Sequence, residues 1–353
     1  MQNSEIEQGP RAPDPLGIQR VLEPKGFLPQ QAERVDPSLP IAADELLIDV
    51  ESLNIDSASF HQISEACGGD VARIESHILE LVASRGKHHN PVTGSGGMLI
   101  GRVAQVGSQY PVAEKPVQVG DRIATLVSLS LTPLQIRKIK KIHPKIDRVD
   151  IEGHAILFAS GLFAKLPQDL PETVALAVMD VAGAAAQTRT LVRENDTVVV
   201  IGGGGKSGVL CLFEAKRKAG VRTIAVDYTR AATERLSGLS FVDEVIQADA
   251  RNAVEVMDKV WAATKGRMGD VVINVANVPD TEMSSILSCR NKGIVYFFSM
   301  ATSFTRAALG AEGVGADVDL RIGNGYTAGH AELSLNILRD SPELRRLFEK
   351  TYV

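Results

Sequence analysis

The sequence has few cysteines, few aromatic residues and no long apolar run. Its 353 residues include three cysteines, which stand far apart and form neither a CxxC pair nor an even-numbered disulfide set. We therefore expect small buried thiols in a reducing cytoplasm. No apolar run approaches the ~20 residues that span a bilayer, and the polar opening at 1–17 lacks the apolar core of a signal peptide. We expect no membrane partner.

The excess of charge is small as well. Lys and Arg total 38 against 43 Asp and Glu, which gives a net charge of −5. A mildly acidic chain argues against nucleic acid as a partner. The composition, 44% hydrophobic and 23% charged, is typical of a globular protein. At ~150 residues per domain, the length predicts about two domains.

The first half of the chain is rich in strand patterns. Residues 1–16, with three prolines among polar residues, predict a flexible arm. Residues 17–165 form the predicted first domain, in which apolar residues near helical spacing at 70–85 indicate a helical insertion. Its clearest strand patterns are 45–50, 98–106 and 122–127.

Residues 166–353 alternate between apolar strands and helices. Apolar runs bounded by glycines suit strands covered on both faces, so this half predicts a doubly wound parallel sheet. The fold class is therefore α/β. The predicted strands are 197–201, 222–226, 244–246, 270–275, 293–298 and 318–322, and the predicted helices are 172–190, 206–219, 230–236, 253–264, 280–287 and C-terminal helices up to residue 353.

Four consecutive glycines lie between the strand at 197–201 and the following helix. Three residues of this segment fit the GxGxxG dinucleotide fingerprint, and the helix start offers free N–H groups to phosphates. A second strand ends at Asp227, about 20 residues on, where a carboxylate binds the ribose hydroxyls. The predicted cofactor-binding residues here are Gly203, Gly204, Gly205, Lys206, Ser207, Gly208, Asp227 and Arg230.

This glycine-rich segment also admits two other interpretations. A P-loop would need a glycine at the position of Val200. A glycine-rich turn that binds nothing is the structural alternative. The charge of Asp227 favours NAD over NADP because it would repel a 2′-phosphate. The positive charge of nearby Arg230 weakens that preference.

The whole chain resembles the medium-chain dehydrogenase/reductase superfamily. Residues 119–123 (VGDRI) look like its VGDRV turn, and the glycine turn looks like that of its zinc-free quinone oxidoreductases. The resemblance implies a GroES-like β-rich N-terminal domain and a C-terminal Rossmann domain. Zinc members carry Gly-His-Glu where this chain has Gly-Ser-Gly at 94–96. They also carry a cysteine ligand where this chain has Asn-Ile-Asp at 54–56. We therefore expect no metal.

Several blocks more closely resemble the family of L-erythro-3,5-diaminohexanoate dehydrogenases. They are 21–26 (VLEPKG), 53–60 (LNIDSASF), 90–101 (NPVTGSGGMLIG), 124–133 (ATLVSLSLTP), 205–208 (GKSG), 296–304 (YFFSMATSF) and 308–315 (ALGAEGVG). The resemblance implies an NAD-dependent amine dehydrogenase of anaerobic lysine degradation, which yields 5-amino-3-oxohexanoate, ammonia and NADH. Four glycines in a row depart from the Ser or Ala expected in that family's turn.

Oxidation of an amine needs a general base. An alkylammonium resembles lysine, with a pKa of ~10.4, and must lose a proton before hydride leaves its carbon and water attacks the iminium. Asp56 is the first candidate, with a helix cap as the alternative. Glu312, expected in a loop at 310–313, is the second, with a solvated carboxylate as the alternative. Asp180 is the third, because a carboxylate in an apolar helix needs a partner or a cleft.

Other polar residues are candidates for binding the substrate. Asn54, Ser128 and Ser130 are expected to contact it, the two serines from one face of a predicted strand that also carries Thr132; ordinary strand hydroxyls are the alternative. Arg306 is a candidate for the substrate carboxylate.

Strand ends supply the remaining candidates. Asn274 and Ser299 are expected near the nicotinamide, with a capping asparagine as the alternative for Asn274. Adjacent His88 and His89 would point to opposite faces of an extended strand, so we predict surface residues rather than metal ligands.

The predicted function is NAD-dependent oxidation of a small diamino acid in the cytoplasm. The alternatives are a zinc-free quinone or enone reductase and a non-catalytic NAD-binding protein. A homodimer or higher homo-oligomer is expected, since symmetric dimers are the commonest assembly.

Overall fold

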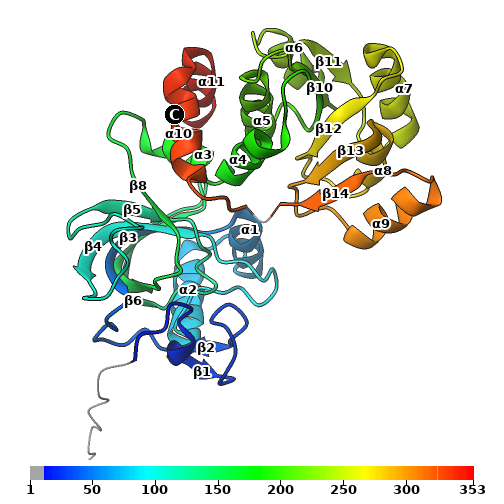
Figure 1. The fold of residues 1–353 in the computed structure, drawn as a ribbon. Helices are drawn as coiled ribbons and strands as arrows, with labels where there is room; N and C mark the ends of the chain where they lie inside the picture. Colours follow the sequence, from blue (N-terminus) through cyan, green and yellow to red (C-terminus); the bar gives the residue numbers. More distant parts are fainter. Residues whose placement is uncertain (1–11, 324) are drawn as a thin grey trace, which may run out of the picture. The chain divides into compact units, whose positions relative to one another are not determined.

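The computed structural model describes residues 12–323 and 325–353, which form two compact units that divide after Pro167 (Figure 1). Most of the predicted arm at 1–16 lies outside the described residues. Its described end is bonded to the N-terminal unit: the Asp14 carboxylate accepts from the backbone N–H groups of Leu16 and Ile18, and the Pro15 carbonyl accepts from Ser160.

An antiparallel six-stranded sheet forms the N-terminal unit, in the order β6-β7-β3-β4-β5-β8. Its strands are β3 (Leu46–Asn54), β4 (Met98–Val106), β5 (Arg122–Thr125), β6 (Leu134–His143), β7 (Arg148–Leu157) and β8 (Phe163–Lys165), beside a two-stranded ribbon of β1 (Val21–Glu23) and β2 (Arg34–Val35). Alternation of apolar and polar residues along β3 and β7 buries one side-chain row of each strand. The strand patterns at 45–50 and 98–106 are confirmed, and the third ends at Thr125 rather than at 127.

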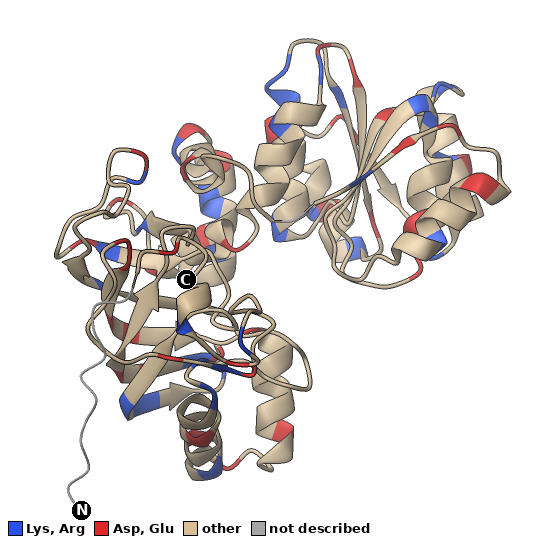
Figure 2. Cartoon of the chain, turned by 60° about the horizontal axis from the view of Figure 1, so that its bottom comes forward, with Lys and Arg blue, Asp and Glu red and all other residues tan. Residues whose placement is uncertain are grey.

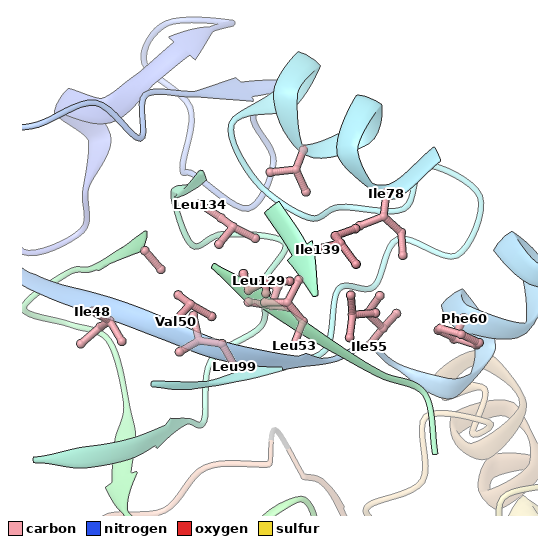
Figure 3. Packing of buried hydrophobic residues seen from close by; sticks show 14 of the residues in the cluster. Ile48, Val50, Leu53, Ile55, Phe60, Ile78, Leu99, Leu129, Leu134 and Ile139 are labelled. Carbon is pink, nitrogen blue, oxygen red and sulfur yellow. The ribbon is translucent and has the colours of Figure 1, made fainter. Parts of the chain in front are cut away.

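Two helices connect β3 to β4 and close the core over the sheet. The predicted helix at 70–85 is confirmed as α2 (Val71–Arg85): Asp70 caps its first turn and Gly86 ends it at φ +68°. It buries Ile74, Ile78 and Val82 in the core shared with the sheet (Figure 3). The preceding helix, α1 (Ser57–Ala66), begins directly after Asp56.

Strand β6 is an open edge that carries strong positive charge. Arg137, Lys138, Lys140 and Lys141 are all exposed, and irregularities in the register of β6 fall at Arg137 and Lys140. Lysines and bulges on an edge strand prevent pairing with other chains. Elsewhere in each unit, basic and acidic residues are interspersed (Figure 2).

The C-terminal unit is a parallel six-stranded sheet in the order β11-β10-β9-β12-β13-β14, as predicted for this half. Its strands are β9 (Thr197–Ile201), β10 (Arg222–Asp227), β11 (Glu244–Gln247), β12 (Gly269–Asn274), β13 (Cys289–Phe297) and β14 (Asp319–Ile322). Residues 198–201 are fully buried, which explains why this strand is a continuous apolar run. The predicted α/β fold class is confirmed.

Nine helices belong to the described part of the C-terminal unit: α3 (Glu172–Met179), α4 (Ala182–Leu191), α5 (Lys206–Lys216), α6 (Arg230–Ser237), α7 (Ala253–Thr264), α8 (Glu282–Leu287), α9 (Phe304–Gly313), α10 (His330–Asp340) and α11 (Pro342–Tyr352). The predicted helix at 172–190 breaks at Asp180, which ends α3. Helices α10 and α11 pack on α3, and α10 also packs on α4. Among the residues that the structure describes, no helix combines the length and apolar character that crossing a membrane requires.

Candidate active site

The glycine turn joins β9 to α5 at the point where the strand order reverses. Gly202 has a φ of +85°, and a Cβ on it would lie 2.8 Å from the backbone nitrogen of Ala276 in the loop after β12. A Cβ on Gly208 would lie 2.4 Å from the Gly202 carbonyl. Both positions therefore require glycine, and the switch point of an open parallel sheet is where nucleotides bind.

Asp227, at the end of β10, is held against this turn. One carboxylate oxygen accepts from the Gly204 N–H at 2.9 Å, and the other accepts from the Thr229 N–H at 3.3 Å. A Cβ on Gly204 would lie 2.8 Å from the Asp227 carboxylate. The N–H groups of the four glycines are bonded within the protein, so the free N–H groups are those at the start of α5. That helix start and the oriented Asp227 carboxylate suit the pyrophosphate and ribose hydroxyls of a dinucleotide.

Basic side chains flank the same turn. Lys206, the first residue of α5, forms an ion pair with Asp180, so the structure supplies the partner that the Asp180 carboxylate was expected to need. Arg230 faces solvent and pairs with Glu234 of its own helix. Arg235, which sequence reasoning missed, donates to the Gly204 carbonyl at 2.8 Å. Its only sequence signal is its place on the helix after β10.

The C-terminal helix reaches the glycine turn. A pocket of about 60 Å³ is lined by Gly204, Gly205, Lys206, Val209, Arg235, Leu347, Phe348, Thr351 and Tyr352. Nothing in the sequence connects α11 with a turn some 150 residues earlier, so this contact depends on the packing of α11.

Asn274 holds the loop that follows β12. It is fully buried, donates to the hydroxyls of Thr281 and Ser285 at 2.8 Å each, and accepts from the Ala276 N–H at 3.1 Å. These bonds occupy its side chain inside the protein. Ser299 follows β13 and accepts from the Ala301 N–H at 3.2 Å. Both residues lie at the carboxyl edge of the sheet, where the glycine turn also lies.

Helix α9 contains two of the predicted site residues. Arg306, in its first turn, forms an ion pair with Asp280. The expectation that Glu312 lies in a loop is wrong: it lies near the end of α9 and is exposed. Because α9 runs back toward the start of β14, Glu312 lies at the edge of the sheet opposite to the glycine turn.

In the N-terminal unit, Asp56 caps helix α1. Its Oδ1 accepts from the N–H groups of Ala58 and Ser59 at 3.1 and 3.4 Å, and from the Ser95 hydroxyl at 3.2 Å. The cap is therefore confirmed. The side chain is nevertheless exposed, so capping leaves the carboxylate accessible. Asn54 ends β3 two residues earlier, and its buried Oδ1 has no hydrogen-bond partner among the described residues.

The predicted strand with Ser128, Ser130 and Thr132 is wrong, because residues 126–133 form turns. The Ser128 side chain accepts from the Ser130 backbone N–H at 3.1 Å and from its hydroxyl at 2.8 Å, and Thr132 donates to the Ser128 carbonyl at 3.0 Å. Such local bonds compete with a strand ladder. Ser130 still lies beside the segment at 88–97: a Cβ on Gly96 would lie 2.5 Å from its backbone nitrogen.

The prediction that His88 and His89 lie on the surface is wrong for His88 and only half-right for His89. His88 is fully buried, and burial lowers its pKa to about 4. Its Nδ1 bonds to the Gly96 carbonyl at 3.1 Å, so this nitrogen is the donor and Nε2 carries the lone pair. His89 is partly buried, which lowers its pKa too. In the described residues no group of three or more His, Cys, Asp and Glu side chains is placed to hold a metal.

The antiparallel unit and the parallel sheet with its glycine turn define a medium-chain dehydrogenase/reductase fold. An alcohol dehydrogenase from Thermotoga maritima shares this fold with a TM-score of 0.55 at 14% identity, covering 88% of this chain and 85% of that one. A quinone oxidoreductase from Pseudomonas syringae does so with a TM-score of 0.51 at 18% identity, covering 92% and 86%.

Sequence comparison narrows the class to one family. The chain is 55% identical to the L-erythro-3,5-diaminohexanoate dehydrogenase of Acetoanaerobium sticklandii and 50% identical to that of Fusobacterium nucleatum, in both cases over 96% of this chain and 98% of the relative. The model of the L-erythro-3,5-diaminohexanoate dehydrogenase N-terminal domain matches residues 19–167. The chain belongs to the L-erythro-3,5-diaminohexanoate dehydrogenase family, as the resemblance in its sequence implied.

Proposed function

We propose that this protein oxidises L-erythro-3,5-diaminohexanoate with NAD, and releases ammonia and 5-amino-3-oxohexanoate. The observation that carries the proposal is the 55% identity, over nearly the whole length of both chains, to a relative that bears this enzyme's name. The alternatives, a quinone reductase or an idle NAD-binding protein, are supported only by distant likenesses of fold.

The residues of the C-terminal unit fit a dinucleotide. The four-glycine turn and the start of α5 would hold the pyrophosphate, and Asp227 would accept hydrogen bonds from the adenosine ribose. When bound, NAD supplies the acceptor for the hydride that leaves the substrate carbon. The negative charge of Asp227 disfavours a 2′-phosphate, which supports NAD over NADP.

Asp56 is the base that the geometry supports. All three of its hydrogen bonds go to Oδ1, and Oδ2 accepts from no group in the described chain. An ammonium can therefore donate its proton to Oδ2 while Oδ1 stays fixed at the helix start. Once the amine is neutral, hydride loss gives an iminium. Asp56, whose side chain is exposed, first releases that proton to solvent, and its carboxylate can then take a proton from the water that attacks the iminium carbon.

Substrate binding needs acceptors for a second ammonium group. Asn54, two residues before Asp56, has a buried Oδ1 that accepts from no donor among the described residues. We propose that this oxygen accepts a hydrogen bond from the second ammonium group. Ser128 and Ser130 would contribute hydroxyls from their turn, and Arg306 would leave Asp280 to pair with the substrate carboxylate. Glu312 takes no part, because it lies at the wrong edge of its sheet. Asp180 acts through Lys206 rather than as an acid or base. No step requires a protein-bound metal.

The test is a direct assay with the purified protein. NAD and L-erythro-3,5-diaminohexanoate are mixed with it, and the near-ultraviolet absorbance of NADH is followed from neutral to alkaline pH. The proposal predicts a steady rise that needs both reactants. A flat trace at every pH, or reduction of a quinone by NADH in its place, would overturn it.

Cell compartment and assembly are part of the same proposal. Three buried free cysteines fit a reducing cytoplasm. A homodimer is the assembly we propose, on the prevalence of two-fold symmetry. Sedimentation velocity distinguishes it from a monomer of 37.8 kDa.

A further inference from the structure

Three hydroxyl groups lie close together beside the Asp56 carboxylate. Ser59 comes from the first turn of α1, and Thr93 and Ser95 come from the loop before β4. The Ser59 oxygen lies 2.5 Å from the Thr93 oxygen and 2.6 Å from the Ser95 oxygen. Ser59 is fully buried, Ser95 is partly buried and Thr93 is exposed. The cluster therefore runs from solvent, through the protein, to the carboxylate.

The number of protons fixes which group donates to Asp56. Each hydroxyl has one proton to donate, and a carboxylate has none. Ser95 donates to Asp56, so the Ser95 oxygen is only an acceptor toward the other two hydroxyls. It lies 2.6 Å from the Ser59 oxygen and 3.1 Å from the Thr93 oxygen, so either of them can donate to it. In each arrangement the three side chains form one hydroxyl chain that ends on Asp56 Oδ1.

We propose that this hydroxyl chain positions Asp56, so that Oδ1 stays bonded at the helix start and Oδ2 is left to accept the substrate's proton. The inference rests on the proposed function, in which Asp56 accepts the substrate's proton. A donor hydrogen bond favours the carboxylate over the carboxylic acid, and a donor that itself accepts a hydrogen bond is a stronger donor. Ser59, Thr93 and Ser95 are positioning residues, since they act through Asp56.

Among the described residues, none of the charged or titratable groups on the surrounding elements is bonded to Asp56. His61 of α1 pairs with Glu65 at 3.1 Å, and Arg148 at the start of β7 pairs with Asp150 at 2.8 Å. His88, in the segment before Thr93, is buried and bonded to the Gly96 carbonyl. Asp147, which precedes β7, contributes its backbone carbonyl to the Ile55 N–H at 2.9 Å. The Ser95 hydroxyl is thus the side-chain donor that the structure gives to Asp56.

The test compares pH profiles of kcat/KM for four variants of the whole protein. Removing the donor in Ser95→Ala should move the acid limb to higher pH by about one unit, and Ser59→Ala by about half a unit. Ser95→Thr keeps a hydroxyl and should restore the wild-type limb. Ser57→Ala is the matched control, because this neighbouring serine takes no part in the chain. Far-ultraviolet circular dichroism at each pH establishes that the variants are folded.

Each outcome decides a separate claim. Limbs that move in Ser95→Ala and Ser59→Ala, but not in Ser57→Ala, support the hydroxyl chain. A limb that stays in place in Ser95→Ala, or moves equally in Ser57→Ala, overturns it. Activity of the wild type with the diamino acid tests the proposed function independently. Full activity of Asp56→Asn would remove Asp56 as the base, and with it the hydroxyl chain's function, while the reaction itself would stand.

Discussion

Glu45→Gln should destabilise the N-terminal unit strongly, because it leaves a buried guanidinium without its counter-charge. Arg20 and Glu45 are both fully buried, and two N–H groups of Arg20 meet the two Glu45 oxygens at 2.6 Å each. The same guanidinium donates to the carbonyls of Asp36 and Ser38 at 2.9 and 3.0 Å. The ion pair therefore connects Arg20, just before β1, with the segment that precedes β3.

The magnitude follows from the cost of an uncompensated charge. Breaking a buried ion pair by removing one partner costs ~3–5 kcal/mol, against a total stability of ~5–15 kcal/mol for a typical protein. Replacing both partners with apolar residues of similar size is often neutral. Arg20→Met together with Glu45→Leu should therefore recover part of the stability that Glu45→Gln loses, because it removes the unpaired charge but leaves the Asp36 and Ser38 carbonyls without their donor.

The assay must observe this unit separately. The single tryptophan, Trp261, lies in the C-terminal unit, so its fluorescence does not report on β3. Hydrogen exchange of peptides covering residues 34–54 does, and Glu45→Gln should speed it by about two to four powers of ten. Peptides from β9 and β12 are the internal control. Unchanged exchange at 34–54, or a double variant worse than the single one, would refute this reasoning.

Three further predictions concern the cofactor turn and pH. Asp227→Asn removes the charge that we propose to meet the ribose and should raise the KM for NAD by ~10–100-fold in steady-state kinetics; an unchanged KM would contradict the assignment. Gly208→Ala should abolish NADH binding, measured by fluorescence titration, because its Cβ would lie 2.4 Å from the Gly202 carbonyl; normal affinity would show that the turn does not hold the cofactor. His88 has a folded pKa of about 4 against 6.5 unfolded, so the unfolded state binds more protons between these values. Stability should be unaffected by His88 above pH 6.5 and fall by ~2 kcal/mol on going to pH 5; in urea titrations His88→Asn should lose this part of the pH dependence, and an equal loss in both proteins would contradict it.

Local signals predicted the C-terminal half well. The glycine turn, the apolar run of β9 and the helix at 253–264 depend on residues adjacent in sequence, and the structure has all three. A strand buried on both faces must be apolar throughout, and a turn with positive φ must contain glycine. Such requirements can be recognised without knowledge of the rest of the fold.

The predictions from sequence fail where residues distant in the chain determine the local structure. Two glycines around Glu312 suggested a loop, but both lie inside α9, where Gly310 packs against the Met283 side chain of the neighbouring helix. The alternating serines at 128–130 resemble a strand, yet their hydroxyls bond to each other and fold the chain into turns. Burial of His88 depends on the packing of its loop, and two adjacent histidines give no sign of it.

The proposed reaction transfers hydride from the carbon that bears the amine to NAD. Its most direct test is substrate with deuterium at C3, with the product cofactor analysed by mass spectrometry. We predict one deuterium in every NADH formed and a slower rate than with ordinary substrate if hydride transfer limits turnover. NADH without deuterium, or release of ammonia without any reduced cofactor, would contradict the account.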